Sequence, residues 1–299
     1  MTSPTASTKL IAIIGATGGT GLACVEQSLK AGYRVRVLVR NASAFNAEIT
    51  NNPNFEMLMG SVTDVDALER LFTGATDIIN SLGGKEKNST ICSDSQPVIN
   101  KALLKINNPS TRLITVTSIS VGDNYWYSGK FTRAFASWII PNAITDKNKQ
   151  EREIVRSAHS NWCIVRPAGL GDGPVTGKYQ IGDATFAPAG SKQIARQDVA
   201  HAILANCLSG NDTWLRLPMT VGYPPRFHKS DSLKQVSSTQ GTCGGTNVLG
   251  CAVTGAGAGA LVGGPIGAGI GAVGGFIVGQ FAGRRTVTTI TKSCQSSTI

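Results

Sequence analysis

The chain has 299 residues, of which 41% are hydrophobic, and its 28 Lys and Arg against 18 Asp and Glu give a net charge of +10. This composition is typical of a globular protein, and the length allows one large domain or two ordinary ones. The basic residues are scattered, which argues against a nucleic-acid partner. A phosphate-bearing ligand explains the group Arg34, Arg36 and Arg40 better.

Cysteine and histidine positions give no sign of a disulfide framework or a metal site. The seven cysteines are odd in number, irregularly spaced and form no C-x-x-C pair, and the three histidines are isolated. The N-terminal run LIAIIG is too short for a signal peptide and leads directly into a glycine-rich turn. We therefore expect a reducing, cytoplasmic compartment and no metal.

Short apolar runs alternate with amphipathic stretches between residues 9 and 221. Helical patterns such as GLACVEQSLKAG (21–32) and DVDALERLF (64–72) lie between several of these runs. The alternation predicts an α/β fold, a doubly wound parallel Rossmann sheet with helices on both faces. The six runs expected to be strands are LIAII (10–14), RVRVLV (34–39), FEMLMG (55–60), DIINSL (77–82), LITVTS (113–118) and WCIVRP (162–167).

The composition changes after Pro224-Pro225, where a polar, turn-rich stretch begins and a glycine-periodic block follows. We therefore expect four segments along the chain. They are a Rossmann domain at 1–225, a polar linker at 226–248, a glycine-rich helical hairpin at 249–283 and a polar tail at 284–299.

The first expected strand runs directly into a glycine-rich turn, GATGGTG, which opens the first expected helix. Its glycines at 15, 18 and 21 allow a tight turn, close approach of the backbone to a pyrophosphate, and close packing of helix on strand. The helix N-terminus adds free N–H donors and the positive end of its dipole. In this context the turn predicts dinucleotide binding through Gly15, Thr17, Gly18, Gly19, Thr20 and Gly21.

The second expected strand ends at Arg40, about twenty residues beyond the glycines, where the side chain that faces the ribose is expected. An acidic residue there would bind a ribose 2′-hydroxyl, whereas arginine suits a 2′-phosphate. The alternative is an ordinary surface arginine. We predict NADP(H) in preference to NAD(H).

Five motifs lie at matching places of the expected fold: GATGGTG, VLVRN after strand two, GSVTD after strand three, VTSISVGD after strand five, and NWCIVRPAGL. Together they resemble the atypical short-chain dehydrogenase/reductases, in particular the NmrA-like and biliverdin-IXβ-reductase-like NAD(P)H-binding proteins. The resemblance covers about residues 9–221 and gives no account of the rest.

The resemblance implies further cofactor contacts. Ser61 stands where related sequences usually have an aspartate for the adenine amino group, which leaves the Val62 backbone or Asp64 for that task. The segment after strand four would run along the ribose, and the segment after strand six would meet the nicotinamide carboxamide with backbone groups. These residues are Asn80, Ser81, Leu82 and Gly83, and Pro167, Gly169 and Leu170.

The resemblance also places Ser118 at the family's serine position after strand five. Reduction of a carbonyl by hydride needs a proton donor, and the Tyr-x-x-x-Lys pair of the wider superfamily is missing here. The chain instead reads YWYSGK, so Tyr125, Tyr127 and Lys130 are the candidates, the alternative being an aromatic loop that lines the substrate pocket. Lys147 and Lys149 are expected to be solvated helix residues.

Two functions fit these observations. The first is an NADPH-dependent reductase of a small carbonyl, quinone or related electrophile, and the missing Tyr-x-x-x-Lys pair is its weak point. The second is a non-catalytic NAD(P)H-binding redox sensor or assembly factor that associates through its C-terminal segment. The glycine turn supports both equally, whereas the retained Ser118 favours the reductase.

The C-terminal block has glycine at every fourth position from 255 to 283, and no charged residue lies between Lys234 and Arg284. Small residues at this spacing let two helices approach closely, and in lipid the helix is enforced because an unpaired backbone is costly. Gly264-Pro265 breaks the run in the middle, so we expect a hairpin resembling glycine-zipper segments, either membrane-associated or self-associating. The alternative is a disordered Gly/Ala tail.

If these glycines pack one helix on another, Gly271→Leu and Gly275→Leu should disrupt the packing, although both substitutions raise hydrophobicity and helix propensity. Membrane fractionation and alkaline extraction of the full-length chain measure the effect of either change. A disordered tail would gain helix and lose nothing, and a soluble monomeric parent would contradict the hairpin.

Overall fold

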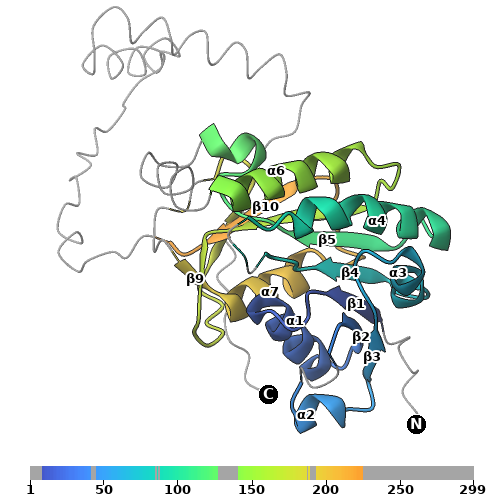
Figure 1. The fold of residues 1–299 in the computed structure, drawn as a ribbon. Coiled ribbons are helices and arrows are strands. Elements are labelled where there is room, and N and C mark those ends of the chain that lie inside the picture. The colour runs from blue at the N-terminus through green and yellow to red at the C-terminus, as the bar shows by residue number, and fades with distance from the viewer. Residues whose placement is uncertain are drawn as a thin grey trace, which may run out of the picture. The chain divides into compact units, whose positions relative to one another are not determined.

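A mostly parallel sheet forms the centre of the computed structural model (Figure 1), which describes residues 9–41, 45–84, 86, 88–126, 141–186, 188 and 193–224. The predicted linker, glycine hairpin and polar tail (226–248, 249–283 and 284–299) lie outside these residues. No helix of the described part is long and apolar enough to cross a membrane.

Within the described residues, the sheet has eight strands in the order β3-β2-β1-β4-β5-β6-β10-β8. Neighbouring strands are parallel except β8, which is antiparallel to β10. The strands are β1 (Leu10–Ile14), β2 (Arg34–Val39), β3 (Phe55–Met59), β4 (Asp77–Asn80), β5 (Arg112–Val116), β6 (Trp162–Pro167), β8 (Gln180–Gly182) and β10 (Pro218–Gly222). A small parallel sheet pairs β7 (Gly169–Gly171) with β9 (Gln193–Ala195).

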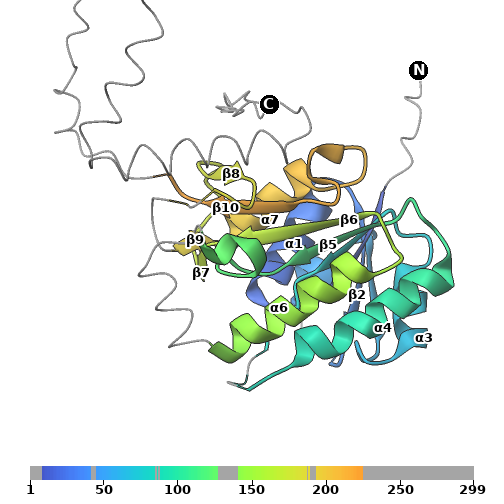
Figure 2. The same cartoon turned by 90° about the horizontal axis from the view of Figure 1, so that it is seen from above.

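Helices cover both faces of the sheet, as Figure 2 shows. α1 and α7 pack against each other on one face, and α3, α4 and α6 pack in a row on the other. The helices are α1 (Gly19–Lys30), α2 (Ala47–Thr50), α3 (Val65–Phe72), α4 (Ile91–Ile106), α6 (Pro141–Arg156) and α7 (Arg196–Asn206), with 3-10 helices at Gly122–Trp126 and Asp212–Trp214.

Strand β1 lies in the middle of the sheet, and both of its faces are buried. Ile11 and Ile13 pack in the core beneath α1 and α7. Ala12 and Ile14 pack in the opposite core with α3 and α4. A strand buried on both faces has no solvent side, so every position is apolar.

The doubly wound parallel sheet and all six predicted strands are confirmed. The sequence did not predict β10 and β8, which extend the sheet beyond β6. β8 has three residues, and β10 begins with a proline and buries Thr220, so neither has the apolar pattern of a longer strand.

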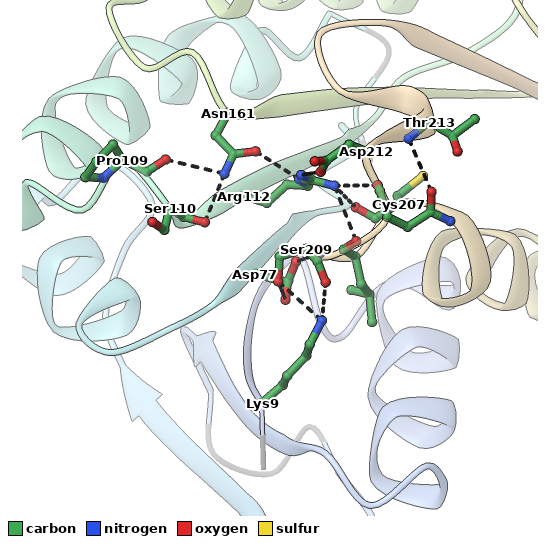
Figure 3. A network of polar contacts seen from close by, with 12 residues as sticks. Lys9, Asp77, Pro109, Ser110, Arg112, Asn161, Cys207, Ser209, Asp212 and Thr213 are labelled. Carbon is green, nitrogen blue, oxygen red and sulfur yellow. Dashed lines mark hydrogen bonds and ion pairs between the residues drawn. The ribbon is translucent and has the colours of Figure 1, made fainter. Parts of the chain in front are cut away.

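At the edge of the sheet where β5 begins, Arg112 holds several segments together (Figure 3). Its side chain is 4% exposed and pairs with Asp212 at 2.5 Å. It donates to the Asn161 side chain at 2.9 Å and to the Asn211 carbonyl at 2.7 Å, and it also reaches the carbonyls of Cys207 and Leu208 just after α7. One buried guanidinium therefore binds carbonyls of the segment that follows α7 and holds this segment at the edge of the sheet.

Buried Asp77, at the start of β4, also holds the segment that follows α7, through Ser209. Its carboxylate accepts from the Ser209 backbone N–H at 2.6 Å and from the Ser209 hydroxyl at 2.9 Å. Lys9 also donates to the Ser209 carbonyl. With this end held, the position of α7 on the sheet is set, and its first residue, Arg196, lies at the other end of the helix.

Candidate functional site

The residues predicted for the cofactor follow the carboxyl ends of parallel strands and therefore meet at one edge of the sheet. Gly15 follows β1, Arg40 follows β2, Ser61 lies just beyond β3, and Ser81 follows β4. In the register of the sheet Ile14 is beside Leu38 and Val39 is beside Met59, so the first three of these strand ends are adjacent.

Two glycines of the turn are required by the protein's own packing. Gly15 has φ +75°, and a Cβ there would lie 2.9 Å from the backbone of Ser81. At Gly21 a Cβ would lie 2.1 Å from the Gly15 carbonyl oxygen. These contacts give Gly15 the tight turn and Gly21 the close packing of helix on strand that the spacing predicts.

Gly18 has a different environment. It caps α1 without a side chain that could bond the first turn, and that turn contains no acidic residue. Thr17, Gly18 and Gly19 are exposed. A Cβ at Gly18 would have one neighbour within 4 Å, the Gly15 carbonyl oxygen at 3.3 Å. The protein leaves this space open beside uncapped N–H groups, which is the arrangement that receives phosphate at a helix N-terminus.

The end of β4 and the residues after it, 80–83, contact the glycine turn and α4 as well as the space expected for the ribose. The Ser81 hydroxyl donates to the carbonyls of Ile14 and Gly15 at 3.0 and 3.3 Å. Buried Asn80 contacts Gln96 on α4 and accepts from the Leu82 backbone N–H. Gly83 is exposed, with nothing within 4 Å of its Cβ position. Of the four residues expected along the ribose, Gly83 is the most open.

Arg40 and Arg36, both from β2, have different roles. Arg40 is exposed, and no described residue forms a hydrogen bond or ion pair with it. Arg36 pairs with Glu56 at 2.7 Å and donates to carbonyls at the end of α3, including Thr73 at 2.7 Å. Of these two arginines, only Arg40 is therefore available for a phosphate; the phosphate explanation was wrong for Arg36.

Beyond β3 the local bonds are those of a helix start. The Ser61 hydroxyl contacts the Thr63 hydroxyl at 2.8 Å, and the Asp64 carboxylate caps α3 by accepting from the Asp66 and Ala67 N–H groups. Val62 packs at the edge of the core beneath α3. Asp64 is thus already engaged in capping, which leaves the Val62 backbone as the expected adenine contact.

Lys147 on α6 was expected to be solvated, and this expectation was wrong. Its ammonium group donates to the Leu82 carbonyl at 2.6 Å, the Val116 carbonyl at 2.9 Å and the Gln150 side chain at 3.2 Å. An ammonium group has three donors, and all three are used. Lys147 therefore joins the ends of β4 and β5 to α6. Lys149 is exposed, as expected.

Lys147 also shows how the chain departs from the Tyr-x-x-x-Lys pattern. A tyrosine four residues before this lysine would stand at position 143, on the first turn of α6, and the chain has Ala143 there. Lys147 thus has no tyrosine at the Tyr-x-x-x-Lys spacing. Nothing in the helical run around Lys147 indicated its partners at Leu82 and Val116, which lie 65 and 31 residues away.

The other predicted catalytic residues are only partly described. Ser118 is half-buried, two residues beyond the Val116 carbonyl that Lys147 binds, and its hydroxyl has no hydrogen-bond partner among the described residues. Tyr125 is half-buried in the 3-10 helix Gly122–Trp126. Tyr127 and Lys130 lie outside the described residues.

Cys92, near the start of α4, lies beside the same strand end. Its thiol contacts the Leu82 carbonyl at 3.4 Å, and the Asp146 carboxylate accepts from its backbone N–H at 3.1 Å. Burial raises the pKa of this thiol, although the charge of Lys147 opposes the effect. Cys92 is therefore held as a neutral thiol and is not an activated nucleophile.

A buried ion pair between Arg166 and Glu151 joins β6 to α6 beside Tyr125. Glu151 on α6 accepts from Arg166 of β6 at 2.7 Å and from the Thr117 hydroxyl at 2.7 Å. Arg166 also pairs with Asp123 at 2.5 Å. These bonds fix the 3-10 helix that carries Tyr125 against α6 and β6.

After β6 the chain turns into the small sheet. The Pro167 carbonyl accepts from the Ile119 N–H at 3.0 Å, so it already has a partner. Gly169 is exposed and Leu170 is half-buried. The loop that follows is anchored by Asp198 of α7, which accepts from the Thr176 N–H at 2.7 Å.

The described residues contain no cluster of His, Cys, Asp or Glu that could hold a metal ion. The described cysteines at 24, 92, 163 and 207 are free thiols. His159 is buried and contacts the Thr111 carbonyl at 2.9 Å, and burial lowers its pKa. It serves the core and not a site.

Known proteins with similar sequences and folds match most of this region. "Reductase pytE" of Aspergillus terreus is 28% identical over 235 residues, which span 64% of this chain and 89% of that protein. A short-chain dehydrogenase/reductase of Veillonella parvula DSM 2008 in complex with NADP has a TM-score of 0.60 at 19% identity, over 72% of this chain and 95% of that one.

ChuY, an anaerobilin reductase from Escherichia coli O157:H7, has a TM-score of 0.57 at 24% identity, over 74% of this chain and 99% of that one. These two structures show a shared fold. A model of the NAD(P)H-binding family matches residues 15–209, from the glycine turn to the end of α7. Since that match covers well over half of the chain, the protein belongs to the NAD(P)H-binding family.

Proposed function

We propose that the protein is an NADPH-dependent reductase of a small carbonyl, quinone or related electrophile. The observation that carries the proposal is the carboxyl edge of the sheet, where an open phosphate cradle at Gly18 lies on the same edge as the strand ends joined by Lys147. The named reductases among its relatives support the same reaction class.

The cofactor would be held mainly by backbone groups and one arginine. The first turn of α1 from Gly18 to Thr20 would bind the pyrophosphate, Arg40 the 2′-phosphate, and the Val62 backbone the adenine. The exposed backbone at Gly83 and Gly169 would line the ribose and the nicotinamide. This donor set is suited to an anionic dinucleotide, because it combines uncapped N–H groups with a guanidinium that has no other partner among the described residues.

When bound, NADPH supplies a hydride from its nicotinamide ring. Ser118, whose hydroxyl has no partner among the described residues, would donate a hydrogen bond to the substrate oxygen as negative charge develops there. Lys147 holds the β4 and β5 ends in place, and its charge would favour negative charge on the same oxygen. Its three donors are already used, so Lys147 positions the site and does not transfer a proton.

The missing tyrosine at position 143 bears on substrate class. Without that donor, the proton for a reduced carbonyl would come from Tyr125, Tyr127 or water. A quinone needs less help from a protein acid, because its reduced oxygen is a much weaker base than an alkoxide. Quinones and related conjugated acceptors are therefore our first candidates within the proposed class.

The segment 249–283 remains a separate proposal. A helical hairpin there would tether the reductase to a membrane or to a second copy of the chain. The alternative to the reductase is a sensor that binds NAD(P)H without turnover.

The full-length chain should oxidise NADPH in the presence of at least one member of a panel of quinones, flavins and aldehydes. Ser118→Ala should lower turnover roughly tenfold or more, with a smaller effect on the Kd for NADPH, because the hydroxyl would act on the substrate. Tight NADPH binding with no turnover on any acceptor would favour the sensor.

Gly18→Val should abolish NADPH binding and leave the domain folded, since its branched side chain would fill the space left for phosphate. Calorimetry measures the binding, and thermal unfolding measures the fold. Gly21→Ala is the matched control: its methyl group collides with the Gly15 carbonyl, so it should destabilise the fold by about 3 kcal/mol or more. Undiminished NADPH binding by Gly18→Val would refute the site.

Arg40→Asp should shift preference from NADPH toward NADH. The change removes a charge-assisted contact that contributes about 1.5–3 kcal/mol, and the new carboxylate suits a free 2′-hydroxyl. Arg40 has no structural partner among the described residues, so stability should change little. Equal affinities of the parent for the two cofactors would contradict the role of Arg40.

A further inference from the structure

A second arginine lies on the glycine turn. Arg196 is the first residue of α7, which packs along α1 (Figures 1 and 2). A Cβ built on Gly19 would lie 2.5 Å from Cδ of Arg196, 2.9 Å from its Nε and 3.6 Å from its Cζ. The arginine side chain therefore crosses directly over the first turn of α1.

This contact explains Gly19, which the turn geometry does not. Gly19 is the first residue of α1, and glycine is a poorer helix former than alanine. All three of the nearest atoms to its Cβ position belong to Arg196. Glycine at this position makes room for the arginine.

The Arg196 guanidinium is only lightly held. One of its nitrogens pairs with Asp172 at 2.5 Å, and the two side chains are 30% and 94% exposed. Its other N–H groups have no partner within the described part of the chain. An exposed ion pair of this kind contributes little to stability, so an anionic ligand competes easily for the guanidinium.

The guanidinium also borders a hollow along the first two turns of α1. The hollow has a volume of about 270 Å³, and its lining residues include Gly19 and Glu26 of α1 together with Asp172, Gly173 and Arg196. Glu26 and Asp172 are the acidic groups that line it, and Arg196 is the one cationic group among its lining residues. The positive charge of Arg196 thus lies at the uncapped end of α1, where the helix dipole favours an anion.

We propose that Arg196 is a further ligand of the cofactor's pyrophosphate, closing over it from α7 while α1 binds it from below. This inference rests on the proposed function, because it names a second contact to the same dinucleotide. Arg196 and Arg40 then have separable roles: Arg40 recognises the 2′-phosphate, whereas Arg196 binds the pyrophosphate that NADPH and NADH share.

Binding of NADPH and NADH to the full-length chain, measured by calorimetry, separates these roles. Arg196→Met should weaken both cofactors by roughly tenfold or more, since it removes a charge-assisted contact to a shared group. Arg40→Met should weaken NADPH alone. Thermal unfolding of each variant checks that the fold is kept.

Asp172→Asn is the matched control for the ion pair. It breaks the same pair but keeps the guanidinium, so it should bind both cofactors at least as tightly as the parent. If Asp172→Asn loses as much affinity as Arg196→Met, the arginine acts by holding the loop and the proposal is overturned.

Gly19→Ala tests the contact from the other side. Its methyl group should displace Arg196 and weaken NADPH in the parent, yet have no further effect in the Arg196→Met background. Equal losses in both backgrounds, or parent-like binding by Arg196→Met, would overturn the role of Arg196 alone. A parent that binds neither cofactor would overturn the proposed function as well.

Discussion

The structure depends most on the approach of α1 to the turn that follows β1, where a single methyl group on Gly21 would lie 2.1 Å from the Gly15 carbonyl. Because no side chain separates them, the helix begins directly above the strand end. The Ser81 hydroxyl binds the same turn from β4. The turn that we propose binds phosphate is therefore shaped by packing between two strands and a helix.

The next residue, Leu82, lies two residues beyond the end of β4 and connects this turn to α6. The Leu82 carbonyl accepts from Lys147, which also holds the end of β5. Side-chain bonds to backbone carbonyls thus link the glycine turn to Ser81, and Leu82 to α6. Under the proposed function, anything that displaces the end of β4 would disturb cofactor binding and substrate positioning together.

The features that the sequence predicted are local, and those it missed are contacts between distant residues. The glycine turn and the six strands follow from spacing and apolar runs within a few residues. Lys147 has its carbonyl partners 65 and 31 residues away, so its own helix gave no sign of them. The glycine at position 19 was explained by the turn, whereas the atoms that a Cβ there would meet belong to Arg196 of α7. Asp64 was offered for adenine, although its position directly before a helical run is that of an N-cap.

The positive charges of the site are held in ways that suit their different tasks. Lys147 has carbonyl and amide oxygens as partners, and no carboxylate forms an ion pair with it in the described part. Its partner Val116 lies two residues before Ser118, so under the proposed function the ammonium group would favour negative charge on a substrate oxygen. Arg40 is exposed and Arg196 carries only a weak, exposed ion pair, so both remain available to phosphates. Lys147 is held in place by neutral oxygens, so its ammonium group keeps a fixed position. Arg40 and Arg196 can instead turn toward a ligand. This difference fits the proposed function, in which the reaction centre is fixed and the cofactor binds and dissociates.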